Sequence, residues 1–348
     1  AGAEGQRAAE AAVEEGRAEV ETREDSTGPD LAAGHSLHGE AFNEGPRQRA
    51  YLMEGTGAVQ FPVTTEHAEV RAFVNQGVGQ LHGFWYLEAE RSFRQAAAID
   101  PQCAIAYWGM AQANRNNEKR AKQFIAKAKD NKGSASRREQ LYIDAWAAYL
   151  EKGSDKKKER HETYLKALDG IVSEFPEDIE AKAWLALEMW NARGSGIPLT
   201  ANAAVDALLE QVLAAEPMHP VHHYRIPLWD APRPQNALVS ASLCGQAAPG
   251  IAHMWHMPGH IFSKLKRYDD AAWQQEASAR VDHAHMMRDR ILPDQIHNFA
   301  HNNEWLIRDL VFVGRGHDAV ALAKNMIELP RHPKYNTVSA LGSSGYGR

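Results

Sequence analysis

Cysteine, long apolar runs and surplus positive charge are all scarce in this sequence. Cys103 and Cys244 are the only cysteines among 348 residues, which excludes a disulfide framework and leaves the redox compartment open. No apolar stretch approaches the roughly 18 residues of a membrane-spanning helix, and the charged, alanine-rich start has no signal-peptide core. We therefore expect a soluble chain with no membrane span, and export through a signal peptide already removed stays compatible with the sequence.

The balance of charge argues against a nucleic-acid partner. The chain has 39 Lys and Arg against 45 Asp and Glu, a formal net charge of −6, whereas general nucleic-acid binders present a net basic surface. The sequence also has no glycine-rich phosphate loop, no nucleophile elbow and no dinucleotide fingerprint. Histidine is therefore the residue type on which a functional site would depend.

From Thr64 onward, apolar residues recur with the period of amphipathic helices. The first pair of helices has an aromatic residue, a small residue four later, then an A-x3-F-x2-A helix closed by proline, a spacing typical of helical-hairpin repeats. The residues with this spacing are Phe73, Gly77, Ala89, Phe93, Ala96 and Pro101. Similar patterns predict a hairpin at 137–175 and helices at 179–193, 201–215, 236–247, 269–280 and 318–329.

Two segments resemble a known family. Gly83 to Pro101 reads GFWYLEAERSFRQAAAIDP, and His256 to Phe262 reads HMPGHIF. The chain resembles tetratricopeptide repeat proteins, in particular bacterial ones with a histidine-rich HMPxHIF segment. The resemblance implies an all-α superhelix of helical hairpins (an α-solenoid) over residues 59–335, with the first helix of each hairpin lining a concave groove. We expect residues 1–58 to be mobile or extended, and 336–348 to be a flexible tail of a truncated chain.

Histidine is the most unevenly distributed residue, since ten of the 17 fall between His219 and His301. His253, His256 and His260 stand at i, i+3 and i+7, which places them on one face of a helix. His256 and His260 also form an HxxxH pair, a spacing that can hold one metal ion between successive turns.

The repeat spacing aligns further histidines with this face. His219 and His222 align with His253 and His256, and His301 aligns with His253 from the next unit, with His297 one turn earlier. Because the resemblance makes these helices neighbours, we predict a histidine-lined groove within residues 217–313. The predicted metal ligands are His222, His253, His256, His260, His297 and His301.

Neutral imidazoles bind zinc, copper and iron, so the predicted cofactor is a transition metal of one of these kinds. Three or four histidines leave a position open for water or substrate. Glu304, three residues after His301, is predicted as the base of a metal-assisted reaction. Whether the chain is an enzyme is left open.

The alternative hypothesis is a metal-free groove that binds a peptide or protein ligand. The histidines, with Arg308 and Trp255, would then contact an acidic partner. A groove filled by the chain's own N-terminal segment would count against this hypothesis. Pro258 is a concern for the metal hypothesis, because proline can break a helix. A break would leave the site to His256, His260, His297 and His301.

The remaining histidines are interpreted without a metal. His223, His283 and His285 fall off the aligned face and are expected to have supporting or structural roles. The short motif His35-Ser-Leu-His38-Gly-Glu40 has potential ligands, but its length makes a plain loop the preferred interpretation.

Overall fold

The computed structural model describes residues 50–293, 296 and 298–330. This part of the chain folds into fourteen α-helices and three short 3-10 turns, and no β-strand occurs in it. The all-α helical-hairpin fold expected from the sequence is confirmed. The expectations for the first 49 residues, for 336–348, and for His35, His38 and Glu40 concern residues outside the described part.

The helices follow one another as hairpins, each made of a first and a second helix that pack together. The hairpins are α2 (Ala68–His82) with α3 (Tyr86–Ile99), α4 (Ala104–Ala113) with α5 (Glu118–Asn131), α6 (Arg137–Glu151) with α7 (Lys157–Glu174), α8 (Ile179–Asn191) with α9 (Asn202–Ala215), α10 (His222–Trp229) with α11 (Leu238–Ala247), α12 (Ala252–Lys264) with α13 (Tyr268–Asp289), and α14 (Phe299–Phe312) with α15 (Gly316–Glu328).

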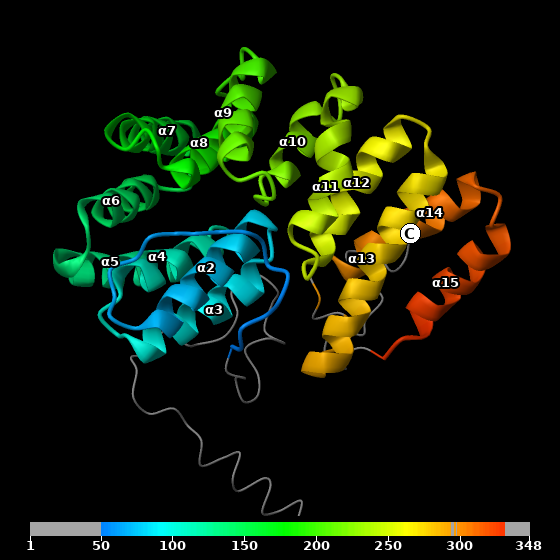
Figure 1. Cartoon of the computed structure of the whole chain (residues 1–348), viewed down its shortest axis with the longest axis horizontal. Helices are drawn as coiled ribbons and strands as arrows, with labels where there is room; N and C mark the ends of the chain where they lie inside the picture. Colours follow the sequence, from blue (N-terminus) through cyan, green and yellow to red (C-terminus); the bar gives the residue numbers. More distant parts are fainter. Residues whose placement is uncertain (1–49, 294–295, 297, 331–348) are drawn as a thin grey trace, which may run out of the picture.

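The hairpins follow a curved path, and each packs chiefly on its neighbours in the chain (Figure 1). The curvature brings the end of α2 to elements from much later in the sequence. A Cβ on Gly83 would lie 2.8 Å from the Ile251 side chain, and the Nδ1–H of His223 donates to the carbonyl oxygen of His82 over 2.7 Å. The first hairpin therefore contacts the hairpins that carry most of the histidines.

Small residues let neighbouring helices approach closely. Gly77 of α2 and Gly109 of α4 both face the ring of Phe93, which is fully buried in α3. A Cβ at Gly77 would lie 2.7 Å from this ring, and a Cβ at Gly109 would overlap it. The spacing of Gly77 and Phe93 thus has a packing reason: a large ring fills the space left by glycines on two first helices.

Residues 50–66, here called the N-terminal strap, have no helix and run along α2 (Figure 1, blue). The backbone N–H of Phe61 donates to Asn75 of α2 over 2.8 Å. The Phe61 ring stacks on Trp108 of α4 with centroids 5.4 Å apart, and it meets Tyr142 of α6 edge-on. The strap therefore covers the face shared by three successive first helices.

The strap also reaches the later hairpins. The backbone N–H of Gly250, just before α12, donates to the carbonyl of Gly55 over 2.8 Å. The Tyr51 hydroxyl donates to the Asp289 carboxylate at the end of α13 over 3.0 Å. These contacts join the strap to the hairpin of α12 and α13, far along the curved path.

Two details of the histidine region bear on the sequence expectations. α12 is one continuous helix that passes through the buried Pro258, so the proline does not break the helix that was expected to carry the three histidines. α13 continues to Asp289, well past the predicted end at residue 280, because no glycine or proline interrupts residues 281–289. Within the described ranges, none of the helices is long and apolar enough to cross a membrane.

The Phe93 contact gives a test of the packing. Gly109→Ala should lower the free energy of unfolding by about 1 to 3 kcal/mol, because its methyl group overlaps the buried ring. The matched control is Gly170→Ala in α7, where a Cβ meets no atom within 4 Å and helix propensity should add roughly 1 kcal/mol. Urea unfolding followed by circular dichroism measures both, and equal effects of the two changes would contradict this account.

Candidate metal centre

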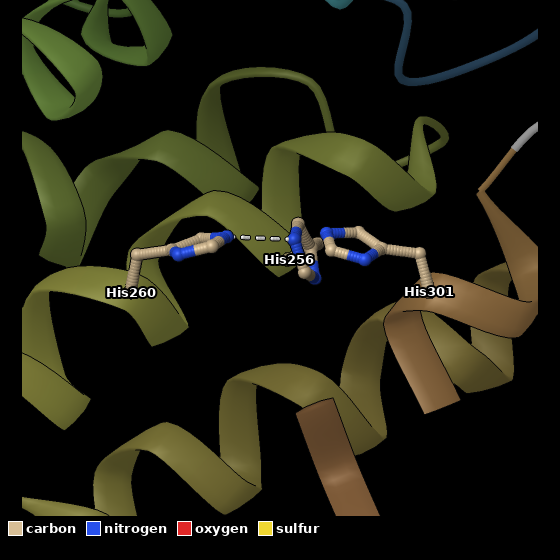
Figure 2. A group of neighbouring side chains, drawn as sticks. All are labelled: His256, His260 and His301. Atoms are coloured by element: carbon tan, nitrogen blue, oxygen red, sulfur yellow. Dashed lines mark hydrogen bonds between the residues drawn. The ribbon is translucent and has the colours of Figure 1, made fainter. Parts of the chain in front are cut away.

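Three histidines converge at the boundary between α12 and α14. His256 and His260 come from α12 and His301 from α14, and one nitrogen of each lies within 4.8 Å of the other two. Figure 2 shows the rings of His260 and His301 approaching His256 from opposite sides. The Nε2 atoms of His256 and His260 are 2.9 Å apart. We call this group the histidine triad.

A glutamine fixes the tautomer of His256. The Nε2 amide of Gln275, in α13, donates to the His256 carbonyl over 3.1 Å, which turns the Gln275 Oε1 toward the His256 ring. Oε1 lies 2.7 Å from Nδ1, and because it can only accept, Nδ1 carries the proton. The Nε2 of His256 therefore presents a lone pair to the triad, and the same outer partner that sets the tautomer would orient a metal ligand.

Glycine at position 259 makes room for this glutamine. A Cβ on Gly259 would overlap the side-chain amide of Gln275. The close approach of α12 and α13 at this point thus places the amide against the backbone and ring of His256, which is completely buried. Gly259 therefore allows α12 and α13 to pack closely and also lets Gln275 orient the His256 ring.

Two of the triad imidazoles, His256 and His260, are kept neutral. Burial lowers the pKa of His256 well below its usual value, and the neighbouring His260 and His301 lower it further. Burial, then His301, Lys264 and Arg308, lower the pKa of His260 to about 4. A proton on His260 Nε2 donated to His256 Nε2 satisfies both nitrogens. A metal ion between them would require the other tautomer of His260, with its proton on Nδ1 and the Nε2 lone pair free to bind.

The convergence follows from a constant register between α12 and α14. Asn298 donates to His253 Nδ1 over 2.9 Å, the rings of His256 and His301 lie 4.8 Å apart, and the rings of His260 and Trp305 lie 4.2 Å apart. At the next turn, Ser263 donates to Asp309 over 2.8 Å. Facing residues differ by 45 or 46 positions throughout, so the two helices run in the same direction, and we call this contact line the seam.

Two predicted ligands lie apart from the triad, and a third is outside the described residues. His253 and His260 are seven residues apart on one helix, about 10.5 Å along its axis, so one ion cannot bind both, although they share a face. His222 uses both ring nitrogens elsewhere, in contacts of 3.1 Å to the Ser240 hydroxyl and 2.9 Å to the Pro217 carbonyl. His297 falls outside the described residues.

Glu304, the predicted base, lies beside the triad. Its Oε2 is 3.9 Å from Nδ1 of His301, and the side chains of His301 and Glu304 are 45% and 33% exposed. The outer side of the triad therefore opens toward solvent next to a carboxylate.

A second group of possible ligands is wholly buried. His82 Nε2 lies 2.8 Å from one oxygen of Glu180, and His219 Nε2 lies 3.0 Å from the other. The N–H of Val221 donates to Nδ1 of His219 over 3.2 Å, so Nε2 of this ring carries a proton and donates to Glu180.

Metal binding to this second group would need another tautomer of His219, with Nδ1 protonated against the Val221 N–H. Nδ1 of His82 lies 2.6 Å from the Tyr224 hydroxyl, which can either donate or accept a hydrogen bond. Burial opposes the charge on Glu180, but the two histidines outweigh it and hold its pKa below the usual value. The group is a hydrogen-bonded network that joins α2, α8 and the turn that precedes α10.

Sequence reasoning missed Gln275 and this buried network. Gln275 had a signal, because it follows Ala271 at i+4 and precedes Ser278 at i+3, and both are inward-facing positions of α13. A long polar residue at such a position needs an internal partner. His82 and Glu180 are 98 residues apart, and no local spacing connects them.

Two comparisons with known proteins find no match. No protein-family model matches the chain, and no curated protein matches it. A functional proposal for this chain therefore depends on the geometry of the histidine triad.

A small cavity lies behind His253. Its volume is about 20 Å³, room for one water molecule, and its polar lining includes Asp282, Asn298 and Asn302. Asn302 donates to the Asp282 carboxylate over 2.8 Å. Burial raises the pKa of Asp282 to about 7, although this hydrogen bond opposes the rise.

Asp282 should therefore make stability depend on pH. The unfolded chain releases this proton near pH 4 and the folded chain near pH 7, so the carboxyl has no effect below about pH 4 and destabilises the fold increasingly up to about pH 7. Asp282→Asn should raise the free energy of unfolding at about pH 8 by roughly 2 to 4 kcal/mol more than at about pH 4. Urea titrations at both pH values measure this difference, with the exposed Asp269→Asn on the same helix as control. An equal gain at both pH values would contradict the account.

Proposed function

We propose that the chain is a tetratricopeptide-type superhelix that holds one transition-metal ion through His256, His260 and His301. The observation that carries the proposal is the fixed tautomer of His256, whose lone pair points at a second imidazole nitrogen 2.9 Å away. Three imidazoles on two helices are a ligand set that zinc, copper and iron accept. All three metals accept this ligand set, so elemental analysis of the purified protein identifies the bound ion.

The buried network of His82, Glu180 and His219 supports the choice of site by contrast. Both groups have ligand atoms within 4.8 Å of one another. In the network, the Nε2 proton of His219 is already donated to a carboxylate and its Nδ1 accepts a backbone N–H. In the triad, Gln275 leaves the Nε2 of His256 as an acceptor directed at the other imidazoles.

The open outer side of the triad favours a catalytic role over a purely structural one. A bound ion would supply Lewis acidity to a water or substrate at that side. Glu304, 3.9 Å from His301, is the group placed to take a proton there. We propose metal-assisted hydrolysis or oxidation as the reaction type, with Glu304 as base.

The metal-free peptide groove is the second candidate function, and the strap restricts it to the later hairpins. The N-terminal strap already covers the faces of α2, α4 and α6, with Phe61 packed on Trp108 and Tyr142. A peptide partner would have to displace these aromatic contacts from three first helices. The α12–α14 seam has no such covering in the contacts described for the strap.

Metal binding can be tested on protein purified without a histidine tag. We expect one cobalt(II) or zinc(II) ion per chain, a rise in melting temperature on loading, and loss of that rise with a chelator. His260→Ala and His301→Ala should each weaken binding by about a hundredfold or more, beyond the 10- to 100-fold typical of an outer partner. His283→Ala, an exposed histidine of α13, is the control. Unchanged cobalt affinity in the triad variants would overturn the proposal.

Gln275 gives a second, independent test. Gln275→Leu should weaken metal binding about 10- to 100-fold, because His256 loses the acceptor that holds its tautomer. Gln275→Glu keeps an acceptor for Nδ1–H and should restore most of the affinity. Gln246→Leu, at an exposed position of α11, is the matched control. Isothermal titration with zinc(II) measures all three variants, and equal affinity of the Leu and Glu variants would show that Gln275 does not orient the ligand.

A further inference from the structure

The seam continues one turn beyond the triad, and there it becomes basic. Lys264 follows His260 by four residues on α12, and Arg308 follows His301 by seven on α14. The contact between Ser263 and Asp309, 2.8 Å long, shows that the register holds at this turn. Lys264 and Arg308 therefore flank the same end of the seam, and both are exposed.

These two cations lack the ion pairs that nearby basic residues make. Arg267 pairs with Asp270 at 2.6 Å and Arg315 with Asp318 at 2.7 Å. Across residues 50–293, 296 and 298–330, no carboxylate lies within 4 Å of Lys264 or Arg308.

Trp305 lies between the triad and Arg308. Its ring is 4.2 Å from that of His260, and the Arg308 guanidinium sits 4.9 Å from the Trp305 ring centroid. The aromatic contact restricts the guanidinium to this end of the seam. The carboxyl of Asp309 is buried and accepts a hydrogen bond from Ser263, which directs it toward α12. The triad, an indole ring and two cations thus follow one another along the seam.

We infer that the triad takes an organic oxyanion as its ligand or substrate, with a donor group at the metal, an apolar body over Trp305 and a carboxylate or phosphate held by Lys264 and Arg308. This inference rests on the proposed function, because the donor group needs a bound ion. It adds the chemical class of the substrate and assigns Lys264 and Arg308 as specificity residues.

The test uses cobalt-loaded full chain and two hydroxamates that differ only at the far end. Glutaric acid monohydroxamate has a carboxylate there, and pentanohydroxamic acid has a methyl group. The first should bind about tenfold more tightly, as one charge-assisted contact would give, and the difference should shrink at high salt. A probe of the same length that ends in phosphonate distinguishes a phosphate site from a carboxylate site by its relative affinity.

The double variant Lys264→Gln with Arg308→Gln should abolish the preference and leave the affinity for pentanohydroxamic acid unchanged. The control pair, Lys266→Gln with Arg267→Gln, removes the same charge from the exposed turn after α12 and should keep the preference. Equal binding of both hydroxamates, a preference that survives the double variant, or binding of neither probe to cobalt-loaded chain would overturn the inference alone. Failure to take up cobalt would overturn the proposed function together with it.

Discussion

The structure depends on glycines, which let neighbouring helices pack in close contact. Phe93 fills the space beside Gly77 and Gly109 in the first hairpins, and Gly259 leaves the space that Gln275 fills in the later ones. In the first case the result is a buried core, because an aromatic ring takes up the gap. Beside Gly259 the result is an oriented imidazole, because Gln275 enters the gap and hydrogen-bonds to the ring and the carbonyl of His256. One packing rule thus produces both the scaffold and the site.

The seam between α12 and α14 adds a second constraint, which is direction. Two first helices of successive hairpins run the same way, so a residue on one meets the residue 45 or 46 positions later on the other. Ligands, an indole and cations placed on both helices therefore appear in the same order along the seam. A change of one turn in either helix would separate His301 from His256 while leaving the hairpins intact.

Much of the fold was predictable from sequence, and the site only in part. The spacing of Gly77 and Phe93 predicts a hairpin because it reflects contact within one or two neighbouring units. The HxxxH pair predicts His256 and His260 for the same reason, since both lie on adjacent turns. His253 was included because it shares their face, but a shared face says nothing of distance along the axis. The roles of Gln275 and Glu180 depend on which atoms donate and accept across separate helices, which no spacing in a single sequence encodes.

The N-terminal strap has a consequence for the order of folding. The hairpins are built from contacts close in sequence, which form quickly, whereas Tyr51 and Asp289 are 238 residues apart and must wait for the chain between them. The strap is synthesised before every helix it covers, and Phe61 is left without Trp108 and Tyr142 until those helices exist. Docking of the strap on α13 is therefore a late event, although the strap is the first described part of the chain to leave the ribosome.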